Sequence, residues 1–114
     1  MTQERKIPAD ALSFIQEQVR GRRILWTYHV NMRLEGRFVP RRAVLDAVEK
    51  YEIVEAYPED KYLPRYLVLA RHGHEAFHIL FATDVEGKNV RIVTVYRPDP
   101  QEWGPDLRTR RRPR

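Results

Sequence analysis

Apolar positions in the first part of the chain repeat at helical spacing. Within residues 8–20, Leu12, Ile15 and Val19 recur three or four positions apart, and Gly21 follows as a helix-ending residue. The apolar repeat and the glycine that follows it together predict a helix over residues 8–20. The same spacing predicts two further helices, at about residues 28–35 and 40–50.

From residue 52 onward the pattern changes to short β-rich runs separated by turn residues. Four strands are predicted, at residues 52–57, 65–72, 75–83 and 89–97. The loops between them are short enough to join neighbouring antiparallel strands, so we expect a meander. The sequence thus predicts an α+β fold, with the N-terminal helices packed on one face of a four-stranded antiparallel sheet.

The third predicted strand is apolar on both faces, which is typical of a central strand. Alternation places His78 on one face between the small residues Ala76 and Ala82, which leaves space above its ring. One interpretation is that His78 forms the floor of a cleft. The alternative is a hydrogen-bonded core histidine.

The last predicted strand carries two polar side chains of interest. Uninterrupted alternation places Thr94 and Tyr96 on the same face as Val90 and Ile92. Tyr96 is a candidate because it ends a strand that is expected to lie beside the one bearing His78.

The second predicted helix carries a basic pair on its apolar side. On a helical wheel the apolar arc runs from Met32 round to Leu34, and His29 and Arg33 lie inside it. An arginine on a packed face needs an anionic or carbonyl partner, because burying an unpaired charge is costly. Either Arg33 pairs with an acid such as Glu55 and His29 is a hydrogen-bonded core residue, or the two form a functional site.

The net charge of +5 is unevenly distributed. Residues 108–114 hold five arginines and no acid, so residues 1–107 carry 16 basic and 16 acidic groups, while residues 20–42 hold seven arginines against one acid. The planar guanidinium of arginine suits phosphate well. The alternative explanation of this composition is an arginine-rich, heat-tolerant or GC-rich source organism. The candidate nucleic-acid-binding residues are Arg22, Arg23, Arg37, Arg41, Arg42, Arg108, Arg110, Arg111 and Arg112.

Length and composition limit the remaining classes. A chain of 114 residues predicts one domain, here residues 1–107, followed by an arginine-rich tail at 108–114 that we expect to be disordered when free. The chain has no cysteine, which excludes disulfides and thiolate chemistry. It has neither an apolar run long enough to span a membrane nor an apolar stretch after Met1 typical of a secretory signal, so we expect a soluble, cytoplasmic protein.

Metal and cofactor motifs are weak or absent from the sequence. His72, His74 and His78 form a histidine cluster, but Gly73 places the first two in a turn and no carboxylate follows at helical spacing. Glycine-rich phosphate loops and zincin motifs do not occur. We therefore expect neither a metal site nor a cofactor.

Several segments together resemble a known family. They are Ile24–Arg33, Ala43–Ala47, Glu52–Pro58, Phe77–Leu80 and Val93–Pro100. They are similar to the domain of unknown function family 4258 over about residues 10 to 104. The most specific elements are the His-x-x-x-Arg pattern of His29 and Arg33 and the Thr-Val-Tyr-x-Pro-Asp pattern that contains Tyr96.

That family resembles the RelE-like ribonuclease toxins, which have a compact barnase-type α+β fold. The resemblance implies a metal-independent endoribonuclease, the toxin of a toxin–antitoxin pair, whose partners are RNA or the ribosome and a cognate antitoxin. In such chemistry His29 and His78 act as base and acid in either order, Arg33 stabilises the transition state, and Tyr96 positions the substrate or relays a proton.

Two other functions fit the same sequence. A non-catalytic RNA- or ribosome-binding domain would use the surface arginines but would not need His29 and Arg33 on the packed side of a helix. A protein-interaction module would use the tail or a sheet edge, with every histidine structural.

Overall fold

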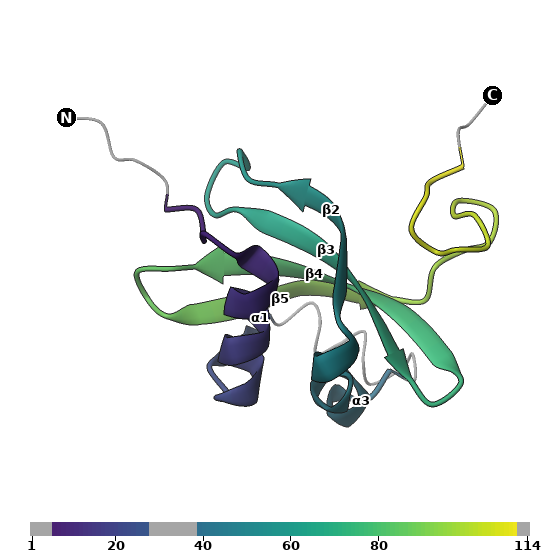
Figure 1. The fold of residues 1–114 in the computed structure, drawn as a ribbon, viewed down its shortest axis with the longest axis horizontal. Coiled ribbons are helices and arrows are strands. Elements are labelled where there is room, and N and C mark those ends of the chain that lie inside the picture. Colours follow the sequence, from purple (N-terminus) through teal and green to yellow (C-terminus); the bar gives the residue numbers. More distant parts are fainter. Residues whose placement is uncertain (1–5, 28–38, 112–114) are drawn as a thin grey trace.

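Five strands form one mixed sheet in the computed structural model, which describes residues 6–27 and 39–111 (Figure 1). The strands are β1 (Ile24–Trp26), β2 (Glu52–Tyr57), β3 (Arg65–His72), β4 (Glu75–Asp84) and β5 (Asn89–Tyr96). They lie in the order β1-β5-β4-β3-β2. The fold is α+β, and β2 to β5 form the expected antiparallel meander.

The prediction of a four-stranded, wholly antiparallel sheet is wrong in one respect. β1 pairs with β5 in parallel and sets Ile24 beside Val90 and Trp26 beside Ile92. This strand is three residues long, too short for an alternating pattern to reveal it, and its partner lies far away in the sequence. It forms because the chain turns back onto the sheet after the first helix.

Two α-helices and a short 3₁₀-helix lie within the described residues, namely α1 (Ala11–Arg20), α3 (Arg41–Asp46) and η1 (Val48–Lys50). Asp10 caps α1 by accepting the backbone N–H of Ser13 at 3.1 Å, so the helix begins after Asp10 rather than at Pro8. The single helix expected at 40–50 divides at Ala47. The helix expected at 28–35 lies outside the described residues.

Both α-helices lie on the same side of the sheet (Figure 1). The helices contribute Ile15, Val19 and Val44, each fully buried, to one cluster with Phe77 and Ile79 of β4. Each such side chain stabilises the fold by about 1.5–3 kcal/mol relative to exposure. None of the helices in the described part of the chain is both long and apolar enough to cross a membrane.

A bulge in β5 alters which side chains face the helices. Leu80 of β4 pairs with Thr94, and Phe81, the next residue of β4, pairs with Ile92. Val93 is therefore one residue more in β5 than β4 has opposite it, which makes a bulge. Thr94 and Tyr96 therefore face away from the helices, while Ile92 lies in the core. The prediction that all three share one face is wrong, because it assumed uninterrupted alternation.

Residues 99–111, the C-terminal segment, fold back against the sheet. Gly104 N–H donates to Thr109 O and Arg111 N–H to Glu102 O, both at 2.8 Å, which makes a small hairpin. Its Trp103 is only 1% exposed. Arg108 to Arg111, part of the tail expected to be disordered, thus have defined positions, and residues 112–114 lie outside the described residues.

Candidate active site on the open sheet face

Two rows of paired residues cross the sheet on the face that the helices leave free. Each row takes one residue from each of β2, β3, β4 and β5, because the four strands are in antiparallel register. The first row is Glu52, Leu69, His78 and Tyr96, and the second is Glu55, Leu67, Leu80 and Thr94. The C-terminal segment covers the first row, and the second borders a pocket.

In the covered row, His78 is fully buried and both its ring nitrogens have partners. Nε2 lies 2.8 Å from the carbonyl oxygen of Leu107, which only accepts, so Nε2 carries the proton. Nδ1 is then the acceptor for the hydroxyl of Tyr96 at 3.1 Å. Burial lowers the pKa of His78, which favours this neutral tautomer.

The structure thus brings together two predicted site residues, His78 and Tyr96. The space expected above the histidine ring is occupied by Trp103, whose ring meets it edge to face. Burial raises the pKa of Tyr96 to about 12, so this phenol stays protonated and donates to His78. Tyr96 also lines the pocket, and it therefore connects the covered row with the open one.

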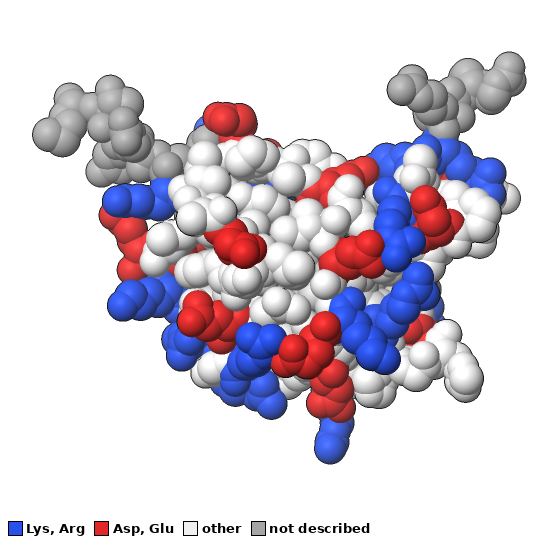
Figure 2. Space-filling view, viewed as in Figure 1, with Lys and Arg blue, Asp and Glu red and all other residues white. Residues whose placement is uncertain are grey.

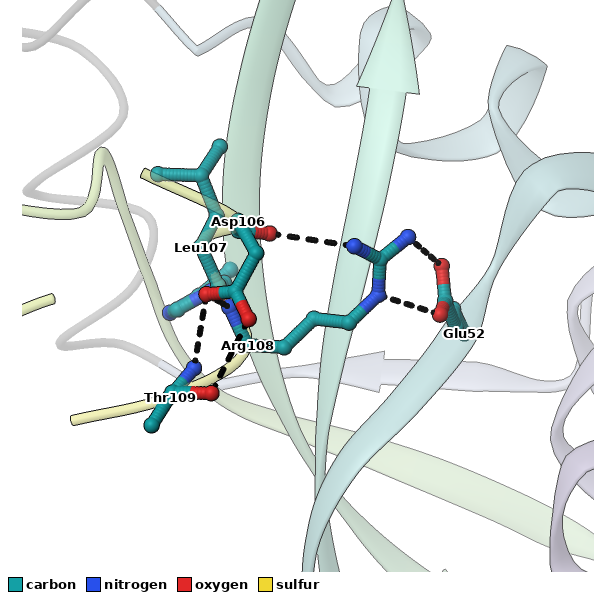
Figure 3. Close-up of polar contacts among 6 residues, drawn as sticks. Glu52, Asp106, Leu107, Arg108 and Thr109 are labelled. Atoms are coloured by element: carbon teal, nitrogen blue, oxygen red, sulfur yellow. Dashed lines mark hydrogen bonds and ion pairs between the residues drawn. The ribbon is translucent and has the colours of Figure 1, made fainter. Parts of the chain in front are cut away.

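Two arginine forks fasten the C-terminal segment to β2. As Figure 3 shows, Arg108 binds the carboxylate of Glu52 through Nε and Nη2. The distance from Nη2 to Oε1 is 2.8 Å. The turn before it is shaped by Asp106, whose side chain accepts the backbone N–H groups of Arg108 and Thr109. Arg110 binds Glu55 in the same bidentate way, with Nε 2.7 Å from Oε2.

The pocket beside the open row has a volume of about 360 Å³. Its floor is apolar, from Leu67 and Leu80, and its walls are polar. Two ion pairs lie in the walls, Arg110 with Glu55 and Arg65 with Asp60 at 3.4 Å. The full lining is Glu55, Tyr57, Asp60, Arg65, Leu67, Leu80, Thr94, Tyr96 and Arg110.

The pKa of Glu55 depends on two hydrogen-bond donors, Arg110 and Tyr57. The Arg110 guanidinium holds the pKa of this carboxyl below its usual value, and the hydroxyl of Tyr57 adds a second hydrogen bond. The same hydrogen bond raises the pKa of Tyr57, which therefore remains a neutral donor. The pocket accordingly presents an ionised acid whose oxygens are already engaged.

Sequence patterns did not identify most of these pocket residues. Tyr57, Asp60 and Arg65 were not among the candidates, and Glu55 was considered only as a partner for Arg33. The alternation of side chains in β2 and β3 could have identified the residues that share this face. A bulge after Ile53 shifts the register of β2, however, so the alternation does not show which of its side chains face the pocket. In the structure Glu55 pairs with Arg110.

The candidate nucleic-acid-binding arginines are divided between two surfaces. Arg22, Arg23, Arg41 and Arg42 belong to the helix layer, where Arg41 lies over the ring of Trp26 and Arg42 pairs with Asp46. Arg108, Arg110 and Arg111 belong to the opposite face, and Arg111 donates to two backbone carbonyls there. On the face seen in Figure 2, acidic and basic side chains are interspersed along the lower border, and separate acidic patches lie within the mostly uncharged surface above it.

Within the described residues, His72 and His78 are not placed to share a metal ion. His72 and His78 lie on opposite faces of the sheet. His72 is two positions from the core residue Ala70 in β3 and so shares its face, whereas His78 pairs with Leu69, which lies on the other face. His72 instead lies 3.7 Å from Asp46. Among residues 6–27 and 39–111, no group of three histidine or acidic side chains is placed to hold a metal ion.

Four predicted site residues, His29, Arg33, Arg37 and Arg112, lie outside the described residues. Their roles remain predictions.

Comparison with known proteins gives a match to a family model. The model of the family described as a domain of unknown function, DUF4258, matches residues 26–97, which include α3, β2 to β5 and the last residue of β1. No curated protein and no solved structure matches the chain. Helix α1 and the C-terminal segment lie outside the matched range.

Proposed function

This chain belongs to the DUF4258 family, and from that premise we propose that it is a metal-independent endoribonuclease acting at the sheet-face pocket. Its resemblance to RelE-like toxins directs the proposal to RNA, with a cognate antitoxin as the protein partner. The observation that carries the proposal is one pocket holding an ionised acid and two arginines, Arg65 and Arg110, over an apolar floor.

These side chains suit transphosphorylation of RNA. The 2′-hydroxyl attacks the neighbouring phosphorus, a base takes its proton, and the 5′ oxygen leaves with a proton from water, which gives a cyclic phosphate and a 5′-hydroxyl. Arg65 and Arg110 supply the planar donors that stabilise the phosphorane charge. The pocket volume is within the range of small-molecule sites.

His78 has an indirect role in this proposal. Its neutral ring accepts from Tyr96 and so orients that phenol at the pocket wall. His78 is therefore a positioning residue, and Tyr96 is the group that contacts substrate. His29 and Arg33 stay in the proposal as the catalytic pair that the family resemblance implies.

The direct test is cleavage of single-stranded RNA by the purified full-length chain in excess EDTA. We expect products with 2′,3′-cyclic phosphate ends and no cleavage where the 2′-hydroxyl is replaced by hydrogen. Arg65→Ala should lower kcat by about 10²–10³-fold, the loss typical of removing one transition-state donor. Arg91→Ala is the matched control, because Arg91 lies on the same sheet with its partner Asp84, outside the pocket.

A second candidate function is RNA or ribosome binding without catalysis. It is favoured by the pairing inside the pocket, where each of the two arginines already has a carboxylate partner. Binding of the same RNA without any cleavage, weakened by substitutions of Arg22, Arg23, Arg41 and Arg42, would support this function over the first.

A further inference from the structure

The two arginine forks of the C-terminal segment are chemically alike but differently placed. Arg108 binds Glu52 and Arg110 binds Glu55, each through Nε and Nη2 to both carboxylate oxygens. Of these two forks, the Glu55–Arg110 pair lines the pocket and the Glu52–Arg108 pair does not. Strand β2 therefore carries two similar carboxylates. The arginine partner of Glu55 lines the pocket, and that of Glu52 does not, so the Glu52 pair serves as a comparison.

Glu55 lies where it could accept a proton from a ligand, but its oxygens are occupied. Oε2 accepts from Arg110, and Oε1 accepts from both Arg110 and the hydroxyl of Tyr57. A general base needs a lone pair within hydrogen-bonding distance of the proton it removes. In the free chain Arg110 holds Glu55 in the ionised form but obstructs its use.

The same guanidinium is well placed to bind a phosphate. An arginine fork binds phosphate bidentately, as it binds carboxylate. Arg110 is held at the pocket wall by more than Glu55, because its guanidinium also lies 4.6 Å from the centre of the Trp103 ring and its backbone forms a bridge with Trp103. Arg110 can therefore change its anionic partner without leaving the pocket.

We propose that the phosphate of a bound RNA takes Arg110 from Glu55, and that the carboxylate released by this exchange is the general base. This inference rests on the proposed ribonuclease function and specifies how its site is switched on. The 2′-hydroxyl proton passes to Glu55 as the bond from the 2′ oxygen to phosphorus forms. The bond from phosphorus to the 5′ oxygen breaks, and that oxygen takes a proton from water.

The exchange makes the base available only when substrate is present. Without a phosphate, the guanidinium occupies both carboxylate oxygens. With a phosphate bound, Glu55 loses its strongest donor and becomes a stronger base, next to the anion that must react. Glu52 has no such role, because its fork with Arg108 lies outside the pocket lining.

The activity test compares Glu55→Gln with Glu52→Gln in the full chain, using single-stranded RNA. Both substitutions are isosteric and both weaken one arginine fork, so any effect on attachment of the C-terminal segment is similar. We expect kcat to fall about 10²–10⁴-fold in Glu55→Gln, the range for loss of a general base, and to stay within about threefold of the unaltered chain in Glu52→Gln. Chemical denaturation of both variants controls for folding.

A second measurement follows the exchange without catalysis. The side-chain carboxyl of Glu55 is titrated by NMR in chain labelled with ¹³C at glutamate, with and without an oligodeoxyribonucleotide, which lacks the 2′-hydroxyl. We expect the pKa of Glu55 to rise when the oligonucleotide binds and that of Glu52 to stay unchanged. An equal shift at both residues, or none at Glu55, overturns the exchange.

The outcomes separate this inference from the function it rests on. Cleavage by the unaltered chain together with full activity in Glu55→Gln overturns the inference and leaves the ribonuclease proposal standing. Absence of cleavage by the unaltered chain overturns the ribonuclease proposal and with it the role of Glu55 as base.

Discussion

The rings of His78 and Trp103 meet edge to face, with their centroids 4.4 Å apart and their planes at 79°. Both side chains are at most 1% exposed. Trp103 lies beyond the range matched by the family model, which ends at residue 97. A side chain outside the matched domain therefore closes the sheet face on which the candidate site is built.

Replacement of Trp103 tests how firmly the C-terminal segment is attached. Trp103→Ala removes a buried indole that packs on His78 and supports Arg110, so we expect a loss of about 3–5 kcal/mol in the free energy of unfolding. Urea denaturation measures the loss, and limited proteolysis should show faster cleavage within residues 99–111. Trp26→Ala on the edge strand β1 is the control and should cost less, because Trp26 is only partly buried. Equal losses would argue against a special role for Trp103.

Local patterns predicted most of the sheet. The four long strands were located because each combines alternating or apolar runs with clear turn residues, such as Gly73, whose positive φ of 63° suits the hairpin between β3 and β4. β1 was missed because its pairing is nonlocal and three residues long. The faces of β5 were predicted wrongly because one extra residue, Val93, reverses the alternation.

The candidate site was harder to predict than the fold. Its open row depends on the register of four strands and on a bulge in β2, none of which a single segment reveals. The arginine-rich composition after residue 107 favoured disorder, but Glu52 and Glu55 offer carboxylates to Arg108 and Arg110. The contact between His78 and Tyr96 could be predicted, because a histidine in an apolar strand needs a polar partner and Tyr96 ends the neighbouring strand.

The pH dependence of stability should reveal the buried His78. Burial lowers its pKa in the folded chain below the unfolded value of about 6.5, so the unfolded chain binds more protons as the pH falls below that value. Stability is therefore highest above about pH 6.5 and falls on acidification, by up to about 1.4 kcal/mol per pH unit until the folded pKa is reached.

Chemical denaturation between pH 5 and 8 measures this slope. His78→Gln should flatten it, because the variant has no imidazole to protonate. His74→Gln, in the exposed turn after β3, is the control and should retain the slope. A slope that survives in His78→Gln would assign the pH dependence to other groups.

The pair His29 and Arg33 carries a separate prediction, made from the sequence alone. We expect either His29→Ala or Arg33→Ala to lower RNA cleavage by at least about 10²-fold while the domain stays folded. The family resemblance implies that His29 takes part in proton transfer and that Arg33 stabilises the transition state, and each of these roles contributes at least that much. Growth of cells expressing each variant and cleavage by the purified variants give the measurement. A folded double variant with full activity would remove both residues from the mechanism.

The last prediction concerns salt and the arginines after residue 107. Removing residues 108–114 deletes five arginines, so the dependence of RNA affinity on salt should flatten by up to about four in log–log slope, if each arginine contacts one phosphate. Arg108 already has a carboxylate partner in Glu52, so its phosphate contact requires exchange and Arg108→Ala alone should flatten the slope by less than about 0.7. Filter binding to single-stranded RNA across salt concentrations measures both. A truncated chain with an unchanged slope would show that these arginines bind β2 or a protein partner rather than RNA.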